Sequence, residues 1–429
     1  MSILRRVCTL MRVDTVRVGN QPNIRGGRQI MSESTWSVPE TEVLQRIHES
    51  LDSDGTDVLA TIVEVEGNAY RRPGAKMLLD EEGTGIGSIT AGCLENELIE
   101  ASDGVLESER PELITYDLTG DDDVWGLGVG CDGIIHVLLE PLTETYRPAV
   151  TAFAAGRHVG VLTVLDDDGG PLERGDRAYV SPNDRTLDLP GDGDDATAWP
   201  ATDLVDPAVT LAEWGRADVV ELDAEGRHLR VFVDGLAAPP ELLAFGTGHD
   251  VGPMVDLATK NDFRVTVVGF RGGVDLAERF PEADRTVTTS PGTLREDLTI
   301  TDETHAVVMT HNFIDDRLTV EALLDSPAPY IGLMGPHDRF QEMVEAFDES
   351  GRSLDDGDLD RIYTPIGLDL GGGSPYQIAH SIVAELLAVV NQRTPKHLRD
   401  REGNIHERIE LDEGSDEDRE ADATAVDTD

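Results

Sequence analysis

A short basic segment is the first place in the sequence where side chains could hold a ligand. The run RRPGAK, residues 71–76, puts Arg71, Arg72 and Lys76 around a Pro-Gly turn. Guanidinium forks and an ammonium on one turn suit a phosphate or another oxyanion. The chain contains only three lysines, so one placed here is notable. We expect these cations to contact an anionic ligand; the competing interpretation is a solvated turn that pairs with nearby acids.

A second candidate is the run GSITAGCLE, residues 87–95, with Ser88, Gly92 and Cys93 at the expected start of a helix. Free N–H groups at a helix N-terminus favour a bound anion. The positive end of the helix dipole there also lowers the pKa of a thiol and favours the thiolate. Small residues also let a bulky ligand approach the backbone. The alternative is a helix-start turn in which Cys93 is a buried small hydrophobe.

A third candidate is the run WGLGVGCDG, residues 125–133, in which Gly128 and Gly130 precede Cys131. Such a loop could cradle a phosphate or a pterin, or it could be a tight bulge before a strand. Two cysteines do not make a zinc site, which takes about four ligands. Cys93 and Cys131 could pair as a disulfide, ligate a soft metal or carry sulfur.

The run FGTGHDVG, residues 245–252, follows one predicted strand and opens a predicted helix. This is the setting of a dinucleotide fingerprint, with Gly246, Gly248 and His249 in the turn. The fingerprint is imperfect, because Val251 occupies the third glycine position and Gly269 stands where an acid would bind a ribose. We expect Rossmann topology with weak affinity for NAD(P).

Polar residues also follow other predicted strands of the sheet that carries this glycine turn. His311 follows the predicted strand at 306–310, and Asp369 follows the one at 362–367. The carboxyl ends of parallel strands line the ligand crevice of an open sheet, so we expect His311, Asp369 and the turn at Gly246 to converge. A single strand-end histidine is more often structural.

The strands and helices that must position these residues follow a pattern that predicts an α/β protein in three parts. An α+β domain is expected over 37–145, a β-rich connecting domain over 146–237 and a Rossmann-like, doubly wound parallel sheet over 238–394. In the first, Ser37 and Glu40 have capping-box spacing before a helix. The other predicted elements of that domain are a strand at 58–65, a hairpin at 77–89, a helix at 94–102 and strands at 113–118 and 134–140. In the third, the predicted elements are strands at 241–245, 263–268, 306–310, 330–334 and 362–367 and a helix at 375–391.

The two ends of the chain differ from the rest. Residues 1–36 form a leader whose first 30 residues carry six arginines and one acid, and we expect translation to begin at Met31. The alternative is a basic targeting arm. Residues 395–429 read as an acidic, disordered tail.

The formal charge of -50, from 85 acidic and 35 basic residues, shapes the remaining expectations. So acidic a surface repels itself unless concentrated salt screens it, which is typical of a salt-in halophile. It argues against binding nucleic acid. No apolar run reaches the roughly 18 residues of a membrane span, and three cysteines fit a reducing cytoplasm.

Taken in order and spacing, these segments resemble the XdhC/CoxI family of xanthine dehydrogenase accessory proteins, here a member of haloarchaeal type. The resemblance covers residues 40–393. The segments that carry it are RRPGAKM, SITAGCLE, YDLTGDDDVWGLGVGCDG, IIHVLLEPL, LLAFGTGHD, VVMTHNF, APYIGLMG and TPIGLDLGG. The chain departs from the family pattern at Ala91, where a glycine is usual, at Gly269, where an acid is usual, and in a thinned basic stretch after GLMG.

The resemblance implies a molybdenum cofactor chaperone rather than a turnover enzyme. Such a protein would protect the cofactor and insert it into an apo molybdenum hydroxylase of xanthine dehydrogenase type, with a cysteine desulfurase as a further partner and a homodimer as the family tendency. Cofactor contacts would fall on the RRPGAK turn, Cys93 and Cys131. The alternatives are an NAD(P)-dependent oxidoreductase and a purely structural assembly factor without its own cofactor.

Overall fold

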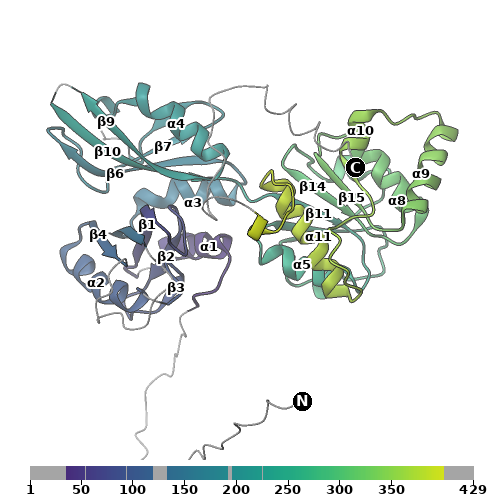
Figure 1. The fold of residues 1–429 in the computed structure, drawn as a ribbon, viewed down its shortest axis with the longest axis horizontal. Coiled ribbons are helices and arrows are strands. Elements are labelled where there is room, and N and C mark those ends of the chain that lie inside the picture. Colours follow the sequence, from purple (N-terminus) through teal and green to yellow (C-terminus); the bar gives the residue numbers. More distant parts are fainter. Residues whose placement is uncertain are drawn as a thin grey trace, which may run out of the picture.

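The protein is represented by a computed structural model that describes residues 35–53, 55–92, 94–118, 133–191, 196–224 and 226–400. These residues form two antiparallel sheets of five strands each and a parallel sheet of six strands. Figure 1 shows the two antiparallel sheets on one side of the molecule and the parallel sheet on the other. The mixed α/β class expected from the sequence is confirmed.

The first sheet is covered by a helix on each face. Its elements are α1 (Glu40–Leu51), β1 (Val58–Gly67), β2 (Lys76–Leu79), β3 (Gly85–Gly87), α2 (Glu95–Ser108), β4 (Glu112–Asp117) and β5 (Gly133–Pro141), with strand order β3-β2-β1-β5-β4. Side chains alternate along β1, so Val58 and Ile62 pack against Leu98 of α2 while Leu59 packs with Ile47 of α1. Both faces of β1 are therefore buried.

Two helix boundaries of this sheet differ from the prediction. Ser37 and Glu40 form no capping box, because α1 begins at Glu40 and the residue before it is Pro39, which has no side-chain oxygen to cap the helix. Helix α2 continues to Ser108 instead of ending at residue 102, because its inner face stays apolar and buried beyond that point, as Val105 shows.

The connecting sheet contains a helix that the sequence did not predict. Its elements are β6 (Val159–Asp168), β7 (Arg177–Ser181), β8 (Thr186–Asp188), α4 (Ala201–Glu213), β9 (Ala217–Ala224) and β10 (Arg227–Leu236), with strand order β8-β7-β6-β10-β9. Pro207 lies inside α4, and proline inside a helical pattern normally signals its end. Burial of Leu204 and Ala208 against the sheet holds the helix together despite that proline.

The two antiparallel sheets share a core. Helix α3 (Arg147–Ala154) leads from one to the other, and Leu138 of the first sheet packs with Phe232 of the second. A buried ion pair also joins them: Arg177 Nη2 donates to both oxygens of Glu140, at 2.6 and 2.8 Å. Apolar packing together with a directional buried pair fixes how these two sheets sit against each other.

The third sheet is parallel and doubly wound, as the sequence predicted. Its strands are β11 (Glu241–Phe245), β12 (Arg264–Gly269), β13 (Arg285–Thr288), β14 (Thr304–Val308), β15 (Tyr330–Leu333) and β16 (Ile362–Tyr363), in the order β13-β12-β11-β14-β15-β16. Its helices are α5 (Val251–Thr259), α6 (Leu276–Arg279), α7 (Leu294–Asp297), α8 (Phe313–Leu324), α9 (His337–Ser350), α10 (Asp356–Asp360) and α11 (Pro375–Val390). From β11 the chain adds β12 and β13 on one side and then returns to add β14, β15 and β16 on the other side. The carboxyl ends of β11 and β14 therefore form the topological switch point.

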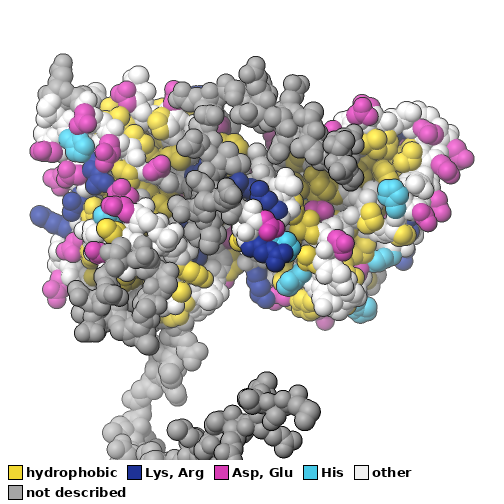
Figure 2. Space-filling model, in the orientation of Figure 1, with side chains coloured by type: hydrophobic (Ala, Val, Ile, Leu, Met, Phe, Trp, Pro, Cys, Tyr) yellow, Lys and Arg dark blue, Asp and Glu magenta, His cyan; other side chains and the backbone are white. Residues whose placement is uncertain are grey.

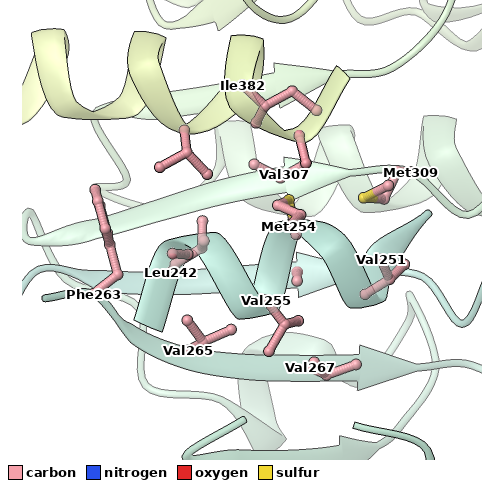
Figure 3. Packing of buried hydrophobic residues seen from close by; sticks show 14 of the residues in the cluster. Leu242, Val251, Met254, Val255, Phe263, Val265, Val267, Val307, Met309 and Ile382 are labelled. Atoms are coloured by element: carbon pink, nitrogen blue, oxygen red, sulfur yellow. The ribbon is translucent and has the colours of Figure 1, made fainter. Parts of the chain in front are cut away.

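Separate apolar cores lie on the two faces of the parallel sheet. Figure 3 shows Met254 and Val255 of α5 and Ile382 of α11 packed over Val265 and Val307 of the strands. The opposite face is covered by α8 and α9. Within the described ranges, no helix is long and apolar enough to cross a membrane.

Two strands of this sheet differ from the prediction. Strand β13 was not predicted, and its short sequence, RTVT, gives little periodic signal. Strand β16 ends at Tyr363 although 362–367 was predicted, because Pro365 has no amide hydrogen to donate to a neighbouring strand.

Candidate functional site

The basic turn connects β1 to β2 and opens into a cavity where the three sheets meet. Its backbone is closed by hydrogen bonds from Gly74 N to Ile62 O (2.8 Å) and from Ala75 N to Arg72 O (3.1 Å). Gly74 has a φ of 93°, and a Cβ there would lie 3.2 Å from the Cβ of Ala217. The turn therefore requires glycine at its tip, both for the backbone angle and for the close approach of the connecting sheet.

The cavity has a volume of about 490 Å³, which is within the range of small-molecule sites. All three parts of the chain contribute to its wall. The charged and aromatic residues that line it are Glu40, Tyr70, Arg71, Arg72, Lys76, Phe153, Arg216, Asp234 and Asp262. Basic and aromatic side chains, together with three carboxylates, thus surround a space large enough for a small planar ligand.

Lys76 has a different role from the one that the sequence suggested. Its Nζ lies 2.6 Å from Asp234 Oδ2 and donates to the carbonyl of Gly74 at 2.8 Å, and its side chain is only 3% exposed. The ammonium is therefore used inside the protein, where it joins β2 to β10. Of the three predicted cations, Arg71 and Arg72 also line the cavity and stay candidate ligand contacts.

Arg71 lies at the point where the first sheet meets the parallel sheet. Its guanidinium forms an ion pair with Glu40 of α1. Burial lowers the pKa of Arg71, while the nearby Asp262 acts in the opposite direction. Asp262 in turn accepts hydrogen bonds from Thr41 N (2.9 Å) and Thr41 Oγ1 (3.0 Å), and burial raises its pKa. These contacts connect the basic turn to the loop before β12.

Arg216 is a lining residue that the sequence analysis missed. It lies between α4 and β9, and its guanidinium carbon is 5.4 Å from the ring centroid of Trp214. Burial lowers the pKa of Arg216, and the positive charges of Arg393 and Arg72 lower it further. Figure 2 shows basic side chains gathered at the centre of the view, between the two halves of the molecule. No local motif marks Arg216, so only the folded arrangement could reveal it.

The second sequence motif lies beside α2. Gly92 is exposed and has a φ of 108°, which favours glycine, and Ser88 is half-buried. Glu95 is buried, and its carboxylate accepts hydrogen bonds from Thr90 N (3.0 Å) and Leu94 N (3.1 Å). The start of α2 is therefore already bonded to a carboxylate of its own, which competes with an incoming anion.

Both cysteines proposed as metal or sulfur ligands lie outside the described residues, as do Gly128 and Gly130. The expected leader over 1–36 and the tail over 395–429 also fall largely outside them. In the part of the chain that is described, no group of three or more His, Cys, Asp or Glu side chains is arranged to hold a metal ion. The roles of Cys93 and Cys131 stay predictions.

The glycine turn of the parallel sheet lies at the switch point, as expected. Gly246 N donates to Val268 O at 3.0 Å, and a Cβ on Gly246 would lie 2.6 Å from Met309 O. Only glycine allows the end of β11 to pass this close to the end of β14. Gly248 follows in the same turn, and α5 begins at Val251.

His311 contacts the glycine turn through the carboxylate of Asp250. His311 Nε2 lies 2.7 Å from Asp250 Oδ2, and Asp250 is the residue immediately before α5. His311 adopts a φ of 59°, which is uncommon outside glycine and marks a strained position. His249 and Asp369 are exposed, and among the described residues neither side chain makes a hydrogen bond or ion pair.

The chain is similar to known proteins along most of its length. The model of the XdhC and CoxI family matches residues 50–117, and that of the XdhC Rossmann domain matches residues 242–386. A probable xanthine dehydrogenase subunit of Bacillus subtilis (strain 168) is 30% identical over 340 residues, 79% of this chain and 94% of its own length. The chain belongs to the XdhC and CoxI family.

Two further proteins are similar to this family member. A crystal structure of a xanthine dehydrogenase from Bacillus halodurans has a TM-score of 0.63 at 26% identity, covering 83% of this chain and 96% of that one. The uncharacterized protein YqeB of Escherichia coli (strain K12) is 27% identical over 176 residues, 41% of this chain and 32% of its own length.

The two ranges matched by the XdhC models leave the connecting sheet between them. The basic turn lies in the range 50–117, and the glycine turn lies in the range 242–386. Arg216 and Asp234, which line the cavity where the three sheets meet (the junction cavity), lie in neither. The cavity of this XdhC and CoxI family member therefore combines residues of a family-matched segment with residues of the connecting sheet.

Proposed function

We propose that this protein binds molybdenum cofactor in the junction cavity and delivers it to a molybdenum hydroxylase of xanthine dehydrogenase type. The observation that carries the proposal is the position of Arg71 and Arg72 on the wall of a cavity formed by all three parts of the chain. Membership of the XdhC and CoxI family supports an accessory role beside such an enzyme. The name of the Bacillus subtilis relative points to the same enzyme.

The residues of the cavity fit this cargo. The cofactor presents a phosphate and a planar pterin that holds the metal through a dithiolene. Guanidinium forks bind phosphate oxygens with two parallel hydrogen bonds, and the exposed ring of Tyr70 offers a surface for a planar group. In a protein of charge -50, the arginines of this wall are the groups that attract an anion, and they share the wall with three carboxylates.

The proposal is tested by cofactor retention. The full chain would be mixed with molybdenum cofactor and desalted, and protein-bound molybdenum and oxidised pterin fluorescence would be measured. We expect near-stoichiometric retention by the natural chain and a loss of at least about tenfold in Arg72→Gln, since hydrogen bonds to charged groups contribute about 1.5–3 kcal/mol. Arg295→Gln is the matched control, because Arg295 is exposed and lies outside the cavity. No retention by the natural chain would refute the proposal.

A second experiment concerns the thiols. Cys93 and Cys131 are the side chains on which we place contacts to the metal or its terminal sulfur. Cys131→Ala is expected to lower cofactor retention, with Cys8→Ala as a matched control outside the motifs. Retention equal to that of the natural chain would remove Cys131 from the site while leaving the role of the arginines intact.

Delivery of the cofactor requires an enzyme that receives it. We place the apo molybdenum hydroxylase as the partner, with a cysteine desulfurase and a second copy of this chain as further candidates, in the cytoplasm. Co-purification of the hydroxylase with this protein before, and not after, cofactor insertion would support delivery. A client that matures equally well without this protein would rule it out.

The parallel sheet also favours a second candidate, an NAD(P)-dependent oxidoreductase. Two contacts weigh against it. The carboxylate of Asp250 stands at the start of α5, where a dinucleotide would place its phosphates. Gly269 stands where the ribose-binding acid of the fingerprint would be, and a Cβ there would crowd Thr247 Cγ2 at 3.0 Å. Saturable NAD(P)H fluorescence below millimolar concentration would restore this candidate.

A further inference from the structure

One of the three carboxylates on the wall of the junction cavity is not part of an ion pair. Glu40 is paired with Arg71, and Asp234 is paired with Lys76. Asp262, in the loop before β12, forms no ion pair within the described ranges. Burial raises the pKa of Asp262, and the charge of Arg71 offsets this effect only in part. The Asp262 carboxylate therefore carries a desolvation cost that no directly paired cation compensates.

A structural role accounts for one oxygen of Asp262. Oδ1 accepts hydrogen bonds from Thr41 N (2.9 Å) and from Thr41 Oγ1 (3.0 Å). Thr41 lies in the first turn of α1, and Pro39 before this helix has no side-chain oxygen to cap it. Asp262 therefore caps α1 from a distant part of the chain. This role explains the position of Oδ1 and leaves Oδ2 without a function.

The second oxygen of Asp262 is available to a ligand. Oδ2 accepts no hydrogen bond from any residue that the structure describes, and it is not one of their buried atoms that lack a partner, so it stays accessible. Because Thr41 holds Oδ1, the carboxylate cannot turn freely and the direction of Oδ2 is set in advance. An ionised carboxylate only accepts hydrogen bonds. A ligand that contacts this residue must therefore bring N–H groups.

We propose that Asp262 determines which planar ring the junction cavity accepts, because its Oδ2 accepts a hydrogen bond from the 2-amino-4-oxopyrimidine edge of a pterin. That edge presents two neighbouring N–H donors, one on the ring and one on the amino group. A ring with a carbonyl in place of the amino group would turn an acceptor toward the carboxylate. The assignment rests on the proposed function and deepens it, because it adds a residue that recognises the ring to the arginines that attract the phosphate. Guanine has the same edge, so the test has to separate the two rings.

The backbone at this position allows a conservative variant. Asp262 has a φ of 64°, a conformation that aspartate and asparagine tolerate better than other side chains apart from glycine. In Asp262→Asn the amide oxygen can still accept from Thr41 N, and the amide nitrogen takes the place of Oδ2. The change therefore keeps the helix cap and the shape of the side chain, and it replaces an acceptor by a donor at one atom.

The first test compares ring preferences. The full chain is added to pterin and to lumazine, which has a carbonyl in place of the amino group, and binding is followed by the fluorescence of each ring. Guanosine is measured by its competition with pterin. We expect the natural chain to bind pterin at least about tenfold more tightly than lumazine, because lumazine forfeits a hydrogen bond to a charged group. Asp262→Asn should lose this preference, since its amide would donate to the lumazine carbonyl.

The matched control is Asp223→Asn, which alters an exposed carboxylate of β9 outside the cavity and should keep the natural preference. Circular dichroism checks that both variants are folded. Failure of the natural chain to bind pterin would overturn the proposal, as would an Asp262→Asn variant that still prefers pterin to lumazine. Tighter binding of guanosine than of pterin would also overturn it, because the ring recognised would then be a nucleobase.

Cofactor retention separates this contact from the proposed function. If Asp262→Asn retains molybdenum cofactor as the natural chain does, Asp262 does not recognise the ring and the proposed function stands. If the natural chain prefers pterin through Asp262 but retains no molybdenum cofactor, the ring contact stands and the proposed function is wrong.

Discussion

Lys76 Nζ lies 2.6 Å from Asp234 Oδ2, and both side chains are buried between the first sheet and the connecting sheet. The ammonium comes from the first residue of β2, directly after the basic turn, and the carboxylate comes from β10. Both residues line the junction cavity, so the pair is part of its wall. It also explains why one of the few lysines of the chain lies at this position.

Removing one partner of this pair should destabilise the protein strongly. Lys76→Met leaves the Asp234 carboxylate buried without its counter-charge, and such a loss costs about 3–5 kcal/mol. Equilibrium urea unfolding would measure it. The double variant Lys76→Met with Asp234→Leu should recover most of the loss. The matched control is Lys260→Met, whose exposed ion pair with Asp256 should contribute less than about 1 kcal/mol.

The stabilisation that the His158–Glu303 pair gives to the contact between the connecting sheet and the parallel sheet should depend on pH. His158 Nε2 lies 3.7 Å from Glu303 Oε1; this carboxylate raises the pKa of His158 above its usual 6.5, and the imidazolium lowers the pKa of Glu303 below its usual 4.5. The contribution from His158 is complete below about pH 6.5 and is lost as pH rises through the raised pKa. The contribution from Glu303 is present above about pH 4.5 and is lost as pH falls through the lowered pKa.

The measurement is the difference in unfolding free energy between the natural chain and His158→Gln across pH 5–9. Because both side chains are partly exposed, we expect a difference below about 1 kcal/mol that is largest near pH 5–6 and declines toward pH 9. His249→Gln, which alters an exposed histidine with no ion pair among the described residues, is the control. A difference that stays constant with pH would exclude this contact as its source.

The glycine turn of the parallel sheet should not tolerate a side chain at its first position. In Gly246→Ala the new Cβ would meet Met309 O at 2.6 Å, a backbone atom that cannot move aside cheaply. We expect a loss of about 1–3 kcal/mol in thermal unfolding, typical of overpacked sites. Gly252→Ala, inside α5 with nothing within 4 Å of the new Cβ, should be neutral or stabilise by up to about 1 kcal/mol. Equal effects of the two changes would contradict the close approach.

The charge of -50 predicts a stability that rises with salt. We expect the unfolding temperature to increase between about 0.1 M and 1 M KCl, over which the Debye length falls from about 10 Å to about 3 Å. Most of the gain should be complete by about 1 M. A rise that continues linearly to much higher concentration would instead indicate general exclusion of salt from the protein surface.

Local pattern was enough to predict the order of the elements. The alternation of strands and helices after residue 238 predicted the parallel sheet, and the glycine turn at Gly246 lies at the switch point of that sheet. Elements with weak or conflicting signals were missed: α4 contains Pro207, and β13 has only four residues. Helix α4 forms because burial of its apolar face against the sheet outweighs a poor local signal, and β13 is held by its backbone pairing with β12.

The sequence by itself indicated the basic turn, because its charges and its Pro-Gly pair are adjacent and the bond from Ala75 N to Arg72 O closes it locally. Tertiary structure alone decided which cations face the cavity. Lys76 was taken out of the ligand site by Asp234 of β10, and Arg216 was brought into it by the packing of the connecting sheet. The reason is that ion pairing and like-charge proximity depend on distance in space, and residues far apart in the chain leave no periodic pattern by which that distance can be read.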